Sequence, residues 1–585
     1  MLIALAAALA VAVTAQPEVG ASSPAPDRVE WVRSRSFPFA TCEAGNGFED
    51  LQPLKQLIGD ARIVALGEGT HGTREFFQTK HRLMEFLATE MGFTIFSIEA
   101  NMPEAYAVDG FVSHGEGDPE GLITGMYFWT WRTTEVADMV RWMRRFNAAD
   151  AGRHVSFTGF DMQTPDKAAK IAVEFLEKAD PEYAATAKGQ YAAMTKARPS
   201  GSGASFGVVS ASFPVAVAAG KKIKYSGWIK TENVSDGYAG LWWRVDGKDG
   251  VLAFDNMGGR GPAGTTPWAL FSIEMVVPAD AGSIVFGTLM PGKGKAWFDG
   301  LEIEVDGQAY AGDQFDLDFE GPALRGFADR MPDRAPPEGY TAKVDAGAAH
   351  SGKQSLSIQS VGPVEKVETG GPTPAAAVKI ADEVLRHMEA ARDGYLKEAS
   401  AKDVDWAIQN ARVVAQCAKM NASSNGYRTR DECMAQNVKW ILEQAPPGSK
   451  IVLWAHNGHV NRAAGCMGSF LNKMYGKDMV VIGFAGATGE YTAVGASGLG
   501  RYPMEEPPAG SLEWYLRATG QPRLIMDVRN PPDDDPTGSW LADPVPMRSI
   551  GAMAMDEQFH PMPVSVFFDA VVYVERTTPA RTFKR

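Results

Sequence analysis

The stretch that decides the fold is 62–99, RIVALGEGTHGTREFFQTKHRLMEFLATEMGFTIFSIE. It opens on a short apolar run, 62–66, that stops at Gly67. Apolar side chains then recur with a period of about 3.6 residues, as in an amphipathic helix, until Gly92 closes the pattern. A second apolar run ends at Glu99. Strand, helix and strand in this order form a βαβ unit, which predicts a parallel sheet covered by helices.

Further apolar runs extend this sheet. They lie at 154–159, 450–454, 479–484, 523–526 and 570–574. Each has the length of a buried strand. The runs fall into two parts of the chain, 28–198 and 373–585. These parts are predicted to form one catalytic α/β domain, with a parallel sheet flanked by helices.

The region between the two parts, 199–372, has a different pattern. The helical period disappears, Gly and Ser become frequent, and short strands alternate with turns. These features are typical of an all-β sandwich. Because the α/β pattern resumes afterwards, the sequence predicts an inserted domain, which a fold tolerates where its chain ends lie close together.

Three motifs in this region resemble the jelly-roll modules found beside carbohydrate-active enzymes. They are SGWIKT at 226–231, WFD at 297–299 and HSGK at 350–353. In such modules the stretch like 317–358 comes first, whereas here it comes last, as in a circularly permuted sandwich. The resemblance implies a carbohydrate as a candidate ligand of the sandwich.

Tryptophan side chains could stack on such a ligand or could pack in the core of the sandwich. The candidates are Trp228, Trp242, Trp243, Trp268 and Trp297. Trp242 and Trp243 are adjacent, so in a regular strand they point to opposite faces, and one of them is expected to be exposed.

Charge and cysteine content exclude several classes of protein. The chain has 585 residues and a formal net charge of −14, and no run of Lys or Arg forms a basic stripe. Neither nucleic acid nor an anionic membrane surface is therefore an expected partner. Four cysteines are too few for a disulfide framework. Cys417 and Cys433 could form a bridge after export, or all four could be buried thiols.

The first 27 residues are predicted to be a signal peptide and leader. Met1–Ala15 is almost entirely Ala, Val and Leu, and it is too short to span a bilayer comfortably. Val13, Thr14 and Ala15 are residues of the small kind that a signal peptidase needs. A basic segment before the apolar run is missing, and a non-cleaved anchor is the alternative. The prediction is export to the periplasm or the exterior, with no membrane span in the mature protein.

Polar residues gather where the predicted strands end. They are Glu68, His71, Glu99, Asp161, Gln163, His456, Asn457 and His459. Open α/β sheets place their ligand sites at the carboxyl ends of strands, so these side chains are expected to lie together.

Histidine and carboxylate in this pattern suit hydrolysis of an ester. The reaction needs a base to activate water, an acid for the leaving alcohol and donors for the developing oxyanion. Imidazole suits the base because its pKa lies near neutrality. Glu68 and His71 are three residues apart in a Gly-rich turn, where the backbone can approach a substrate closely.

Several motifs are similar, in order, to those of the erythromycin esterase family. They are GEGTHGTRE at 67–75, IE at 98–99, GFDMQ at 159–163, RD at 430–431, MA at 434–435 with Asn437, and WAHNGH at 454–459. The match runs from about residue 60 towards the C-terminus and skips the inserted sandwich. Each motif alone is weakly specific, whereas the ordered set is specific.

The resemblance implies a hydrolase of ester bonds that requires no metal and is best known from macrolactones. It assigns the site to Glu68, His71, Glu99, His456 and His459. Residues with an orienting or substrate-binding role would be Glu75, Lys80, Asp161, Arg430 and Asn457. Macrolide esterases usually have Arg near the position of Lys80. Because Arg binds carboxylates as a fork whereas Lys is a point charge, this departure counts against macrolide specificity.

The expected reaction is attack of water on an ester or lactone carbonyl. His71 would be the general base, oriented by Glu68. Glu99 with His456 or His459 would handle the second proton and the oxyanion. The motif set contains no nucleophilic Ser or Cys. GASFG at 203–207 has the GxSxG pattern but lies in a linker without a following helix, which excludes a nucleophile elbow.

Two other functions fit the same residues. Three histidines and two carboxylates could form a metal site in a metal-dependent hydrolase, although no HExxH helix is present. Alternatively, the chain could be a non-enzymatic glycan-binding protein that works through its sandwich. Each site residue also has a structural alternative, as a helix cap or a salt-bridge partner. The substrate class, whether antibiotic, glycan ester or acylated metabolite, stays open.

Overall fold

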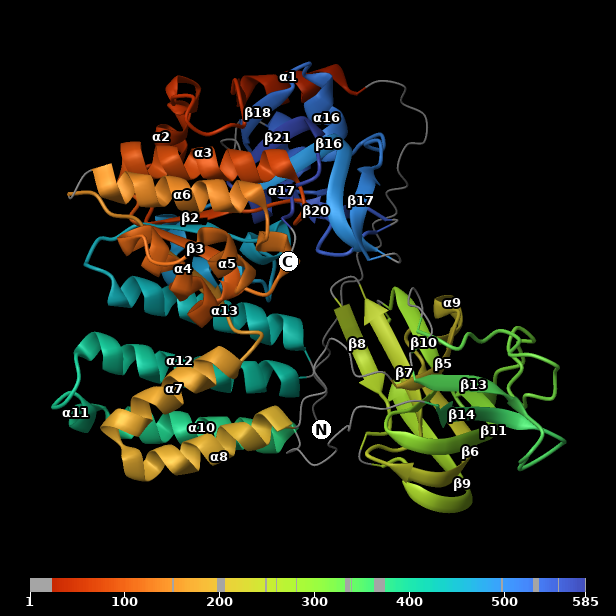
Figure 1. Ribbon diagram of the computed structural model, residues 1–585. Coiled ribbons are helices and arrows are strands. Elements are labelled where there is room, and N and C mark those ends of the chain that lie inside the picture. Colours follow the sequence, from red (N-terminus) through yellow and green to blue (C-terminus); the bar gives the residue numbers. More distant parts are fainter. Residues whose placement is uncertain are drawn as a thin grey trace, which may run out of the picture.

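The structure is a computed structural model with one α/β part and one all-β part, which lie beside each other in Figure 1. The residues it describes are 24–149, 152–196, 206–247, 250–258, 260–279, 281–331, 337, 339–361, 374–423, 425–495, 498–529, 536–555 and 557–583. Nearly all of the predicted leader lies outside these residues, and so do the predicted boundaries at 199 and 372. In the described part of the chain, every helix is too short or too polar to cross a membrane.

The α/β part is built on one nine-stranded sheet. Its order is β1 (Ser36–Pro38), β18 (Arg523–Asp527), β21 (Ala570–Thr577), β16 (Met479–Gly495), β2 (Ile63–Leu66), β15 (Ile451–Trp454), β3 (Ile95–Asn101) and β4 (Ser156–Asp161), with β17 (Gly498–Met504) beside β16. All strand pairs from β21 to β4 are parallel. Each apolar run predicted from the sequence forms one of these strands.

The βαβ unit predicted for residues 62–99 is present. Helix α3 (Arg74–Met91) links β2 to β3. It ends at Gly92, whose φ of 72° is a left-handed conformation that glycine adopts without strain, and whose amide donates to the Leu87 carbonyl. Strand β15, from the second part of the chain, lies between β2 and β3.

One edge of the sheet departs from the prediction of a parallel sheet. Strand β18 is antiparallel to both β21 and β1, and β17 is antiparallel to β16. An apolar run marks a buried strand but carries no information on its direction, so 523–526 could not be oriented from the sequence. Antiparallel edge strands on parallel sheets are common in α/β folds.

Helices cover both faces of the sheet. Side chains alternate along β2, so that Val64 and Leu66 join one hydrophobic cluster and Ile63 and Ala65 join another. The first cluster is formed with α2 (Pro53–Ile58), α3, α4 (Met102–His114), α5 (Pro119–Thr124) and α6 (Thr134–Ala149). The second includes α1 (Pro26–Ser34), α7 (Asp166–Ala179), α8 (Pro181–Lys196), α10 (Pro374–Ala390), α12 (Ala401–Ala422), α13 (Gly426–Gln444), α15 (Met467–Tyr475) and α16 (Leu512–Ala518). Figure 1 shows α8 and α10 as an outer layer beneath α7 and α12.

The all-β part consists of two antiparallel sheets. One has the order β5 (Gly207–Ser212), β10 (Ser283–Met290), β7 (Gly240–Gly247) and β8 (Gly250–Asp255). The other has the order β13 (Tyr340–Asp345), β14 (Ser355–Ser360), β11 (Lys293–Val305), β6 (Lys222–Ser235) and β9 (Gly264–Val276), with β12 (Gln308–Ala309) beside β11. Trp243 and Phe286 of the first sheet share a hydrophobic cluster with Tyr225 and Phe298 of the second.

The expectation that Trp242 or Trp243 is exposed is wrong. The two side chains do belong to different hydrophobic clusters, but Trp242 is 2% exposed and Trp243 is 0% exposed. Trp243 packs between the sheets, whereas Trp242 packs with Val208 and Leu289 in a small separate cluster. That second cluster covers the face where the sequence pattern had predicted solvent.

The four cysteines form no disulfide in the part of the chain that the structure describes, and those at 42, 417 and 433 are buried. Burial raises the pKa of Cys433 to about 12 and that of Cys42 to about 11. Gly207, the last residue of the GASFG motif, begins strand β5 rather than preceding a helix. Ser205 of that motif lies outside the described residues.

Candidate active site

The predicted site residues meet at the carboxyl ends of four neighbouring parallel strands. Glu68 follows β2, Glu99 lies near the end of β3, Asp161 ends β4 and His456 follows β15. All four side chains are buried. The parallel order brings together residues that are almost 400 positions apart in the chain.

Glu68 and His71 form a hydrogen-bonded pair. Glu68 Oε1 lies 2.7 Å from His71 Nδ1. The other carboxylate oxygen accepts from Lys80 Nζ at 2.7 Å and from Trp454 Nε1 at 2.9 Å. Burial opposes ionisation of Glu68, but Lys80 and His71 outweigh it and hold the pKa of the carboxyl below its usual range. A carboxylate in this position fixes the ring of His71 and would stabilise its imidazolium form.

Lys80 is a fully buried cation behind this pair. It lies on the sheet-facing side of α3, with Nζ 4.5 Å from the centre of the Trp454 ring. Burial lowers the pKa of Lys80 to about 8, although Glu68 acts to raise it. The ammonium form therefore predominates at neutral pH and neutralises the charge of Glu68.

A second network holds Glu99. Arg430 Nη2 donates to Glu99 Oε1 at 2.7 Å and to Asp161 Oδ2 at 2.8 Å, and its Nε donates to Asp161 Oδ1 at 3.0 Å. The backbone amide of His456 donates to Glu99 Oε2 at 3.1 Å. Burial opposes ionisation of Glu99, but His459 and Arg430 hold its pKa well below the usual range. Glu99 is therefore a fixed carboxylate.

His459 lies between two carboxylates. Its Nδ1 is 2.9 Å from Asp431 Oδ1, and its Nε2 is 3.1 Å from Arg430 Nη1 and 3.3 Å from Glu99 Oε1. Burial acts to lower the pKa of His459, but the charges of Asp431 and Glu99 raise it to about 10, against the opposing charge of Arg430. Both ring nitrogens of His459 are therefore occupied, and the ring is not available to accept a proton from water.

His456 has the opposite character. Its Nδ1 accepts from the Gly458 amide at 3.0 Å, so its Nε2 carries the proton and donates to the Ile550 carbonyl at 3.0 Å. Burial, followed by the charge of His71, lowers the pKa of His456 to about 3. This ring is neutral and both of its nitrogens are occupied.

His71 is the imidazole of the cluster that keeps a nitrogen available. In the described part of the chain, its Nε2 has no hydrogen-bond partner. Its ring centroid is 4.9 Å from that of His456 and 6.1 Å from that of Trp131, which meets it edge-on. His71 is 9% exposed, so it is largely shielded yet reachable. The arrangement can deliver a base at Nε2.

Two residues that were predicted to orient or bind the substrate, Glu75 and Asn457, hold backbone segments together. Glu75 binds the backbone amide and the hydroxyl of Thr578, at 2.7 and 2.6 Å. The Asn457 amide group donates to the Phe484 carbonyl at 2.9 Å and accepts from the Phe484 amide at 3.1 Å, which fixes the loop after β15 to β16. A Cβ on Gly67 would lie 2.1 Å from Asn457 Oδ1, so glycine is required there.

Four contributing residues were not predicted as site residues. Asp431 follows Arg430 directly and Trp454 stands two residues before His456, and their position in the motifs was the available signal. Trp131 donates to the Glu99 carbonyl at 3.0 Å, and Ile550 contributes only its backbone oxygen. Nothing in the sequence marks either of them.

No group of three or more His, Cys, Asp or Glu side chains among the described residues is arranged to hold a metal ion. The imidazoles of His456 and His459 have their nitrogens directed at other partners.

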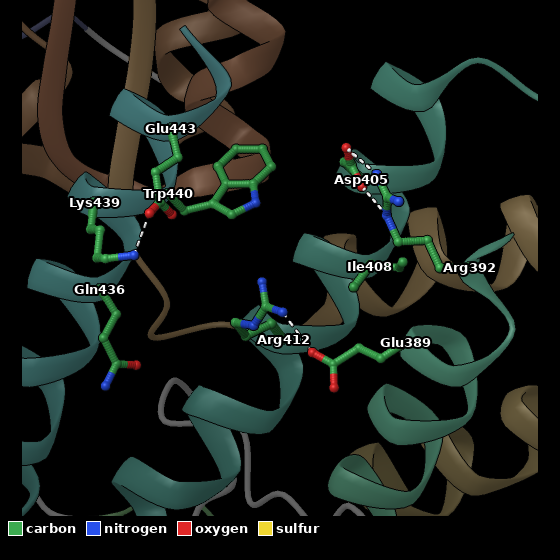
Figure 2. A pocket seen from close by; sticks show the side chains of 9 residues that line it. All are labelled: Glu389, Arg392, Asp405, Ile408, Arg412, Gln436, Lys439, Trp440 and Glu443. Atoms are coloured by element: carbon green, nitrogen blue, oxygen red, sulfur yellow. Dashed lines mark hydrogen bonds and ion pairs between the residues drawn. The ribbon is translucent and has the colours of Figure 1, made fainter. Parts of the chain in front are cut away.

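A separate cavity of 520 Å³ lies between α10, α12 and α13, away from the cluster (Figure 2). Its cations are paired, Arg412 with Glu389 at 2.6 Å, Arg392 with Asp405 at 2.8 Å, and Lys439 with Glu443.

The sequence of this chain is similar to one protein family and to several known proteins. The sequence model of the family described as erythromycin esterase matches residues 88–215 and 339–577, which is more than half of the chain. An erythromycin esterase type II of Escherichia coli is 33% identical over 135 residues, 23% of this chain and 31% of that protein. A putative hydrolase of Bacillus subtilis (strain 168), YbfO, is 28% identical over 155 residues, 26% of this chain and 33% of that protein. The matched segments span about a third of the length of these relatives.

Solved structures share the fold. A Bacillus cereus protein has a TM-score of 0.61 at 17% identity, covering 96% of this chain and 100% of that one. A succinoglycan biosynthesis protein has a TM-score of 0.58 at 17% identity, covering 95% and 98%. An erythromycin esterase mutant in its open conformation has a TM-score of 0.51 at 12% identity, covering 93% and 97%.

Proposed function

Since the chain belongs to the erythromycin esterase family, we propose that it hydrolyses a carboxylic ester or lactone by attack of a water molecule that His71 activates, without a metal. The observation that carries the proposal is the set of contacts made by the ring nitrogens of the three histidines. His456 and His459 have both nitrogens occupied, whereas His71 is bound to Glu68 at Nδ1 and, among the described residues, keeps its Nε2 free.

The proposed reaction proceeds in two steps. His71 Nε2 removes a proton from water while the water oxygen bonds to the carbonyl carbon, and Glu68 stabilises the resulting imidazolium. The tetrahedral intermediate then collapses, the carbon–oxygen bond to the alcohol breaks, and His71 returns its proton to the leaving oxygen. We assign the stabilisation of the oxyanion to Arg430, which is a permanent cation at this end of the sheet.

The sequence predicted that Glu99, with His456 or His459, transfers the proton to the leaving alcohol, and this assignment differs. Glu99 has a pKa well below its usual range and is bound by Arg430, so it is a poor proton donor. His71 itself therefore serves as base and then as acid, and Glu99 holds Arg430 and His459 in place.

Hydrolysis of a panel of simple esters and macrolactones tests this function. The wild-type protein and a His71→Asn variant would be assayed with and without EDTA. Turnover that survives EDTA and falls by about 10³-fold in the variant is the expected result. Loss of turnover with EDTA would instead support a metal-dependent hydrolase using the same cluster.

The sandwich supports a second, separate proposal of carbohydrate binding. On its six-stranded sheet, the Trp228 ring stacks on His350 with a centroid distance of 3.7 Å, and Trp268 meets His350 edge-on at 5.9 Å. We propose jelly-roll kinship and a sugar ligand for this cluster. Retention of the isolated wild-type protein on a polysaccharide column, lost in Trp228→Ala, would support it. If binding occurred without any ester turnover, a non-enzymatic glycan-binding protein would be favoured.

The substrate and the location of the protein are also proposals. The apolar leader supports export to the periplasm or beyond.

The name of the Escherichia coli relative makes a macrolide a candidate substrate, and resistance to such an antibiotic a candidate role. Growth of a host expressing the full chain, compared with His71→Asn, on a macrolide would test that role.

A further inference from the structure

Glu104 is a buried carboxyl group that the proposed reaction does not use. It lies in the first turn of α4, five residues after Glu99. Only 2% of it is exposed, yet neither of its side-chain oxygens has a hydrogen-bond partner among the described residues. The other carboxylates of the cluster, Glu68, Glu99 and Asp161, all have at least two partners. Buried polar groups are normally paired, so an unpaired carboxyl requires an explanation.

The surroundings of Glu104 connect it to the active site. Helix α4 packs along β4, and Asp161 at the end of that strand is held by Arg430. The charged side chains that act on Glu104 are Lys167, Asp166 and Asp161. Lys167, in the first turn of α7, forms no ion pair with Glu104 in the part of the chain that the structure describes. The carboxyl thus lies among two other carboxyl groups, of which Asp161 is paired with Arg430, and one lysine that forms no ion pair among the described residues.

Tyr127 provides an aromatic ring in the same region. It has a φ of 68°, which is rare and strained for a residue with a side chain. It is also 52% exposed. Helix α5, which ends at Thr124 three residues before Tyr127, packs against α4, the helix that carries Glu104. After burial, the charges that raise the pKa of the Tyr127 phenol are those of Glu104 and Asp166. Strained residues cluster at functional sites, and this one presents its ring to solvent.

We propose that Glu104 and Tyr127 form a subsite for an alkylammonium group of the substrate, beside the ester-cleaving cluster. Substituted ammonium ions are bound by the faces of aromatic rings, and a buried carboxylate supplies the opposite charge. Asp161 and Asp166 add to the negative potential, so the subsite would repel an anionic group. The inference rests on the proposed function, because it gives that reaction a preferred class of ester.

The ionisation of Glu104 is consistent with such a ligand. Burial raises the pKa of Glu104 to about 7. In the free protein the carboxyl is therefore only partly ionised near neutrality, and a bound cation would stabilise its charged form.

Two esters that differ only in charge test the subsite. Butyrylcholine and its uncharged analogue 3,3-dimethylbutyl butyrate would be hydrolysed at about pH 8, where Glu104 is largely ionised. For the wild type we expect a KM about tenfold lower for the choline ester, the effect of one charge contact. In Glu104→Gln the two KM values should become equal, while kcat for the neutral ester stays unchanged.

Variants of the ring and of a distant carboxyl serve as controls. Tyr127→Leu should reduce the preference for the cation, whereas Tyr127→Phe should keep it, because the ring face is retained. Glu116→Gln removes an exposed carboxyl just beyond the same helix and should leave the preference intact. An equal loss for both esters in Glu104→Gln, or no preference in the wild type, would overturn the subsite.

The subsite and the esterase function can fail separately. If the wild type cleaved neither ester nor any member of the wider panel, the proposed function would fail. Calorimetric titration of the same protein with tetramethylammonium chloride would then test cation binding at the subsite without any need for turnover. Binding that Glu104→Gln weakens about tenfold supports the inference, and absence of binding overturns it.

Discussion

At the scale of the residue, the site separates three imidazoles by what each ring nitrogen contacts. His459 has a carboxylate oxygen near each ring nitrogen, with Arg430 Nη1 also 3.1 Å from its Nε2, whereas His456 meets one donor and one acceptor and carries a single proton. Among the described residues, His71 bonds only Glu68 and keeps one nitrogen available for water. One residue type thus has three different sets of contacts within a single cluster.

Removal of the Lys80 ammonium should abolish the balance of charge behind His71. In Lys80→Met, Glu68 would be a buried carboxylate without its cation, and we expect a loss of about 3 kcal/mol in the free energy of unfolding. Activity should fall by at least about 10²-fold, because Glu68 would become protonated and stop orienting His71. Urea denaturation and kcat/KM measure the two effects. Lys55→Met, which removes a surface cation paired with Glu90, is the matched control and should change neither value markedly.

His459 should make stability depend on pH in the alkaline range. Its pKa rises from 6.5 to about 10 on folding. A raised folded-state pKa means that its contribution to stability is complete below the unfolded value and is lost as pH rises towards the folded one. Between about pH 6.5 and 10, the free energy of unfolding of the wild type should therefore fall more steeply than that of His459→Gln. Parallel curves for the two proteins would show that His459 is not held as a cation.

The sequence predicted which polar side chains lie together better than it predicted their contacts. Glu68, His71, Glu99, His456 and His459 do converge, because strand ends in a parallel sheet share one edge. What the sequence could not supply were contacts made by backbone atoms of remote loops. The Ile550 carbonyl sets the tautomer of His456, and any residue type would provide that oxygen. Glu75 lay in a matching motif but bonds the distant Thr578.

At the scale of the element, one side chain in the loop after β15 bonds to β16 and packs against the turn between β2 and α3. Asn457 bonds both backbone groups of Phe484 on β16 and leaves no room for a side chain at Gly67. Three consecutive elements of the sheet therefore share a single contact. Apolar patterns predicted each of these strands, yet they could not predict how the loops above them interlock.

Gly67→Ala should consequently damage the site through Asn457. The added Cβ would lie 2.1 Å from Asn457 Oδ1 and displace it, so we expect a loss of about 1–3 kcal/mol in the free energy of unfolding and a fall in kcat. Asn457→Ala should have a similar effect, and the double variant should lose much less than the sum, since both changes break one contact. Gly394→Ala, where no atom lies within 4 Å, is the control. Additive losses would refute this coupling.

At the scale of the whole molecule, the all-β part has its own hydrophobic core. The cluster between its two sheets contains no residue of the α/β part. Helices α8 and α10, which precede and follow this region, pack together, and Gln190 donates to Glu383 across them at 3.2 Å. The two helices that flank the all-β part in the sequence therefore lie against each other.

Deletion of the all-β part should leave the catalytic part active. We expect a protein in which residues 206–361 are replaced by a short Gly/Ser linker to keep kcat/KM on small esters within about twofold, because the two cores are independent. Circular dichroism would confirm the α/β content, and the intact chain with Trp228→Ala would serve as a control for loss of sugar contact alone. Loss of all activity in a folded deletion protein would show that the sandwich contributes to the site.

The position of β15 between β2 and β3 has a consequence for the order of events during synthesis. When the ribosome has completed the first helices and strands, β2 and β3 exist but have no strand to join them, since their common neighbour is added almost 400 residues later. The all-β part emerges in the interval and can fold at once from contacts within itself. Until β15 has been synthesised, the edges of β2 and β3 that pair with it stay without a partner strand.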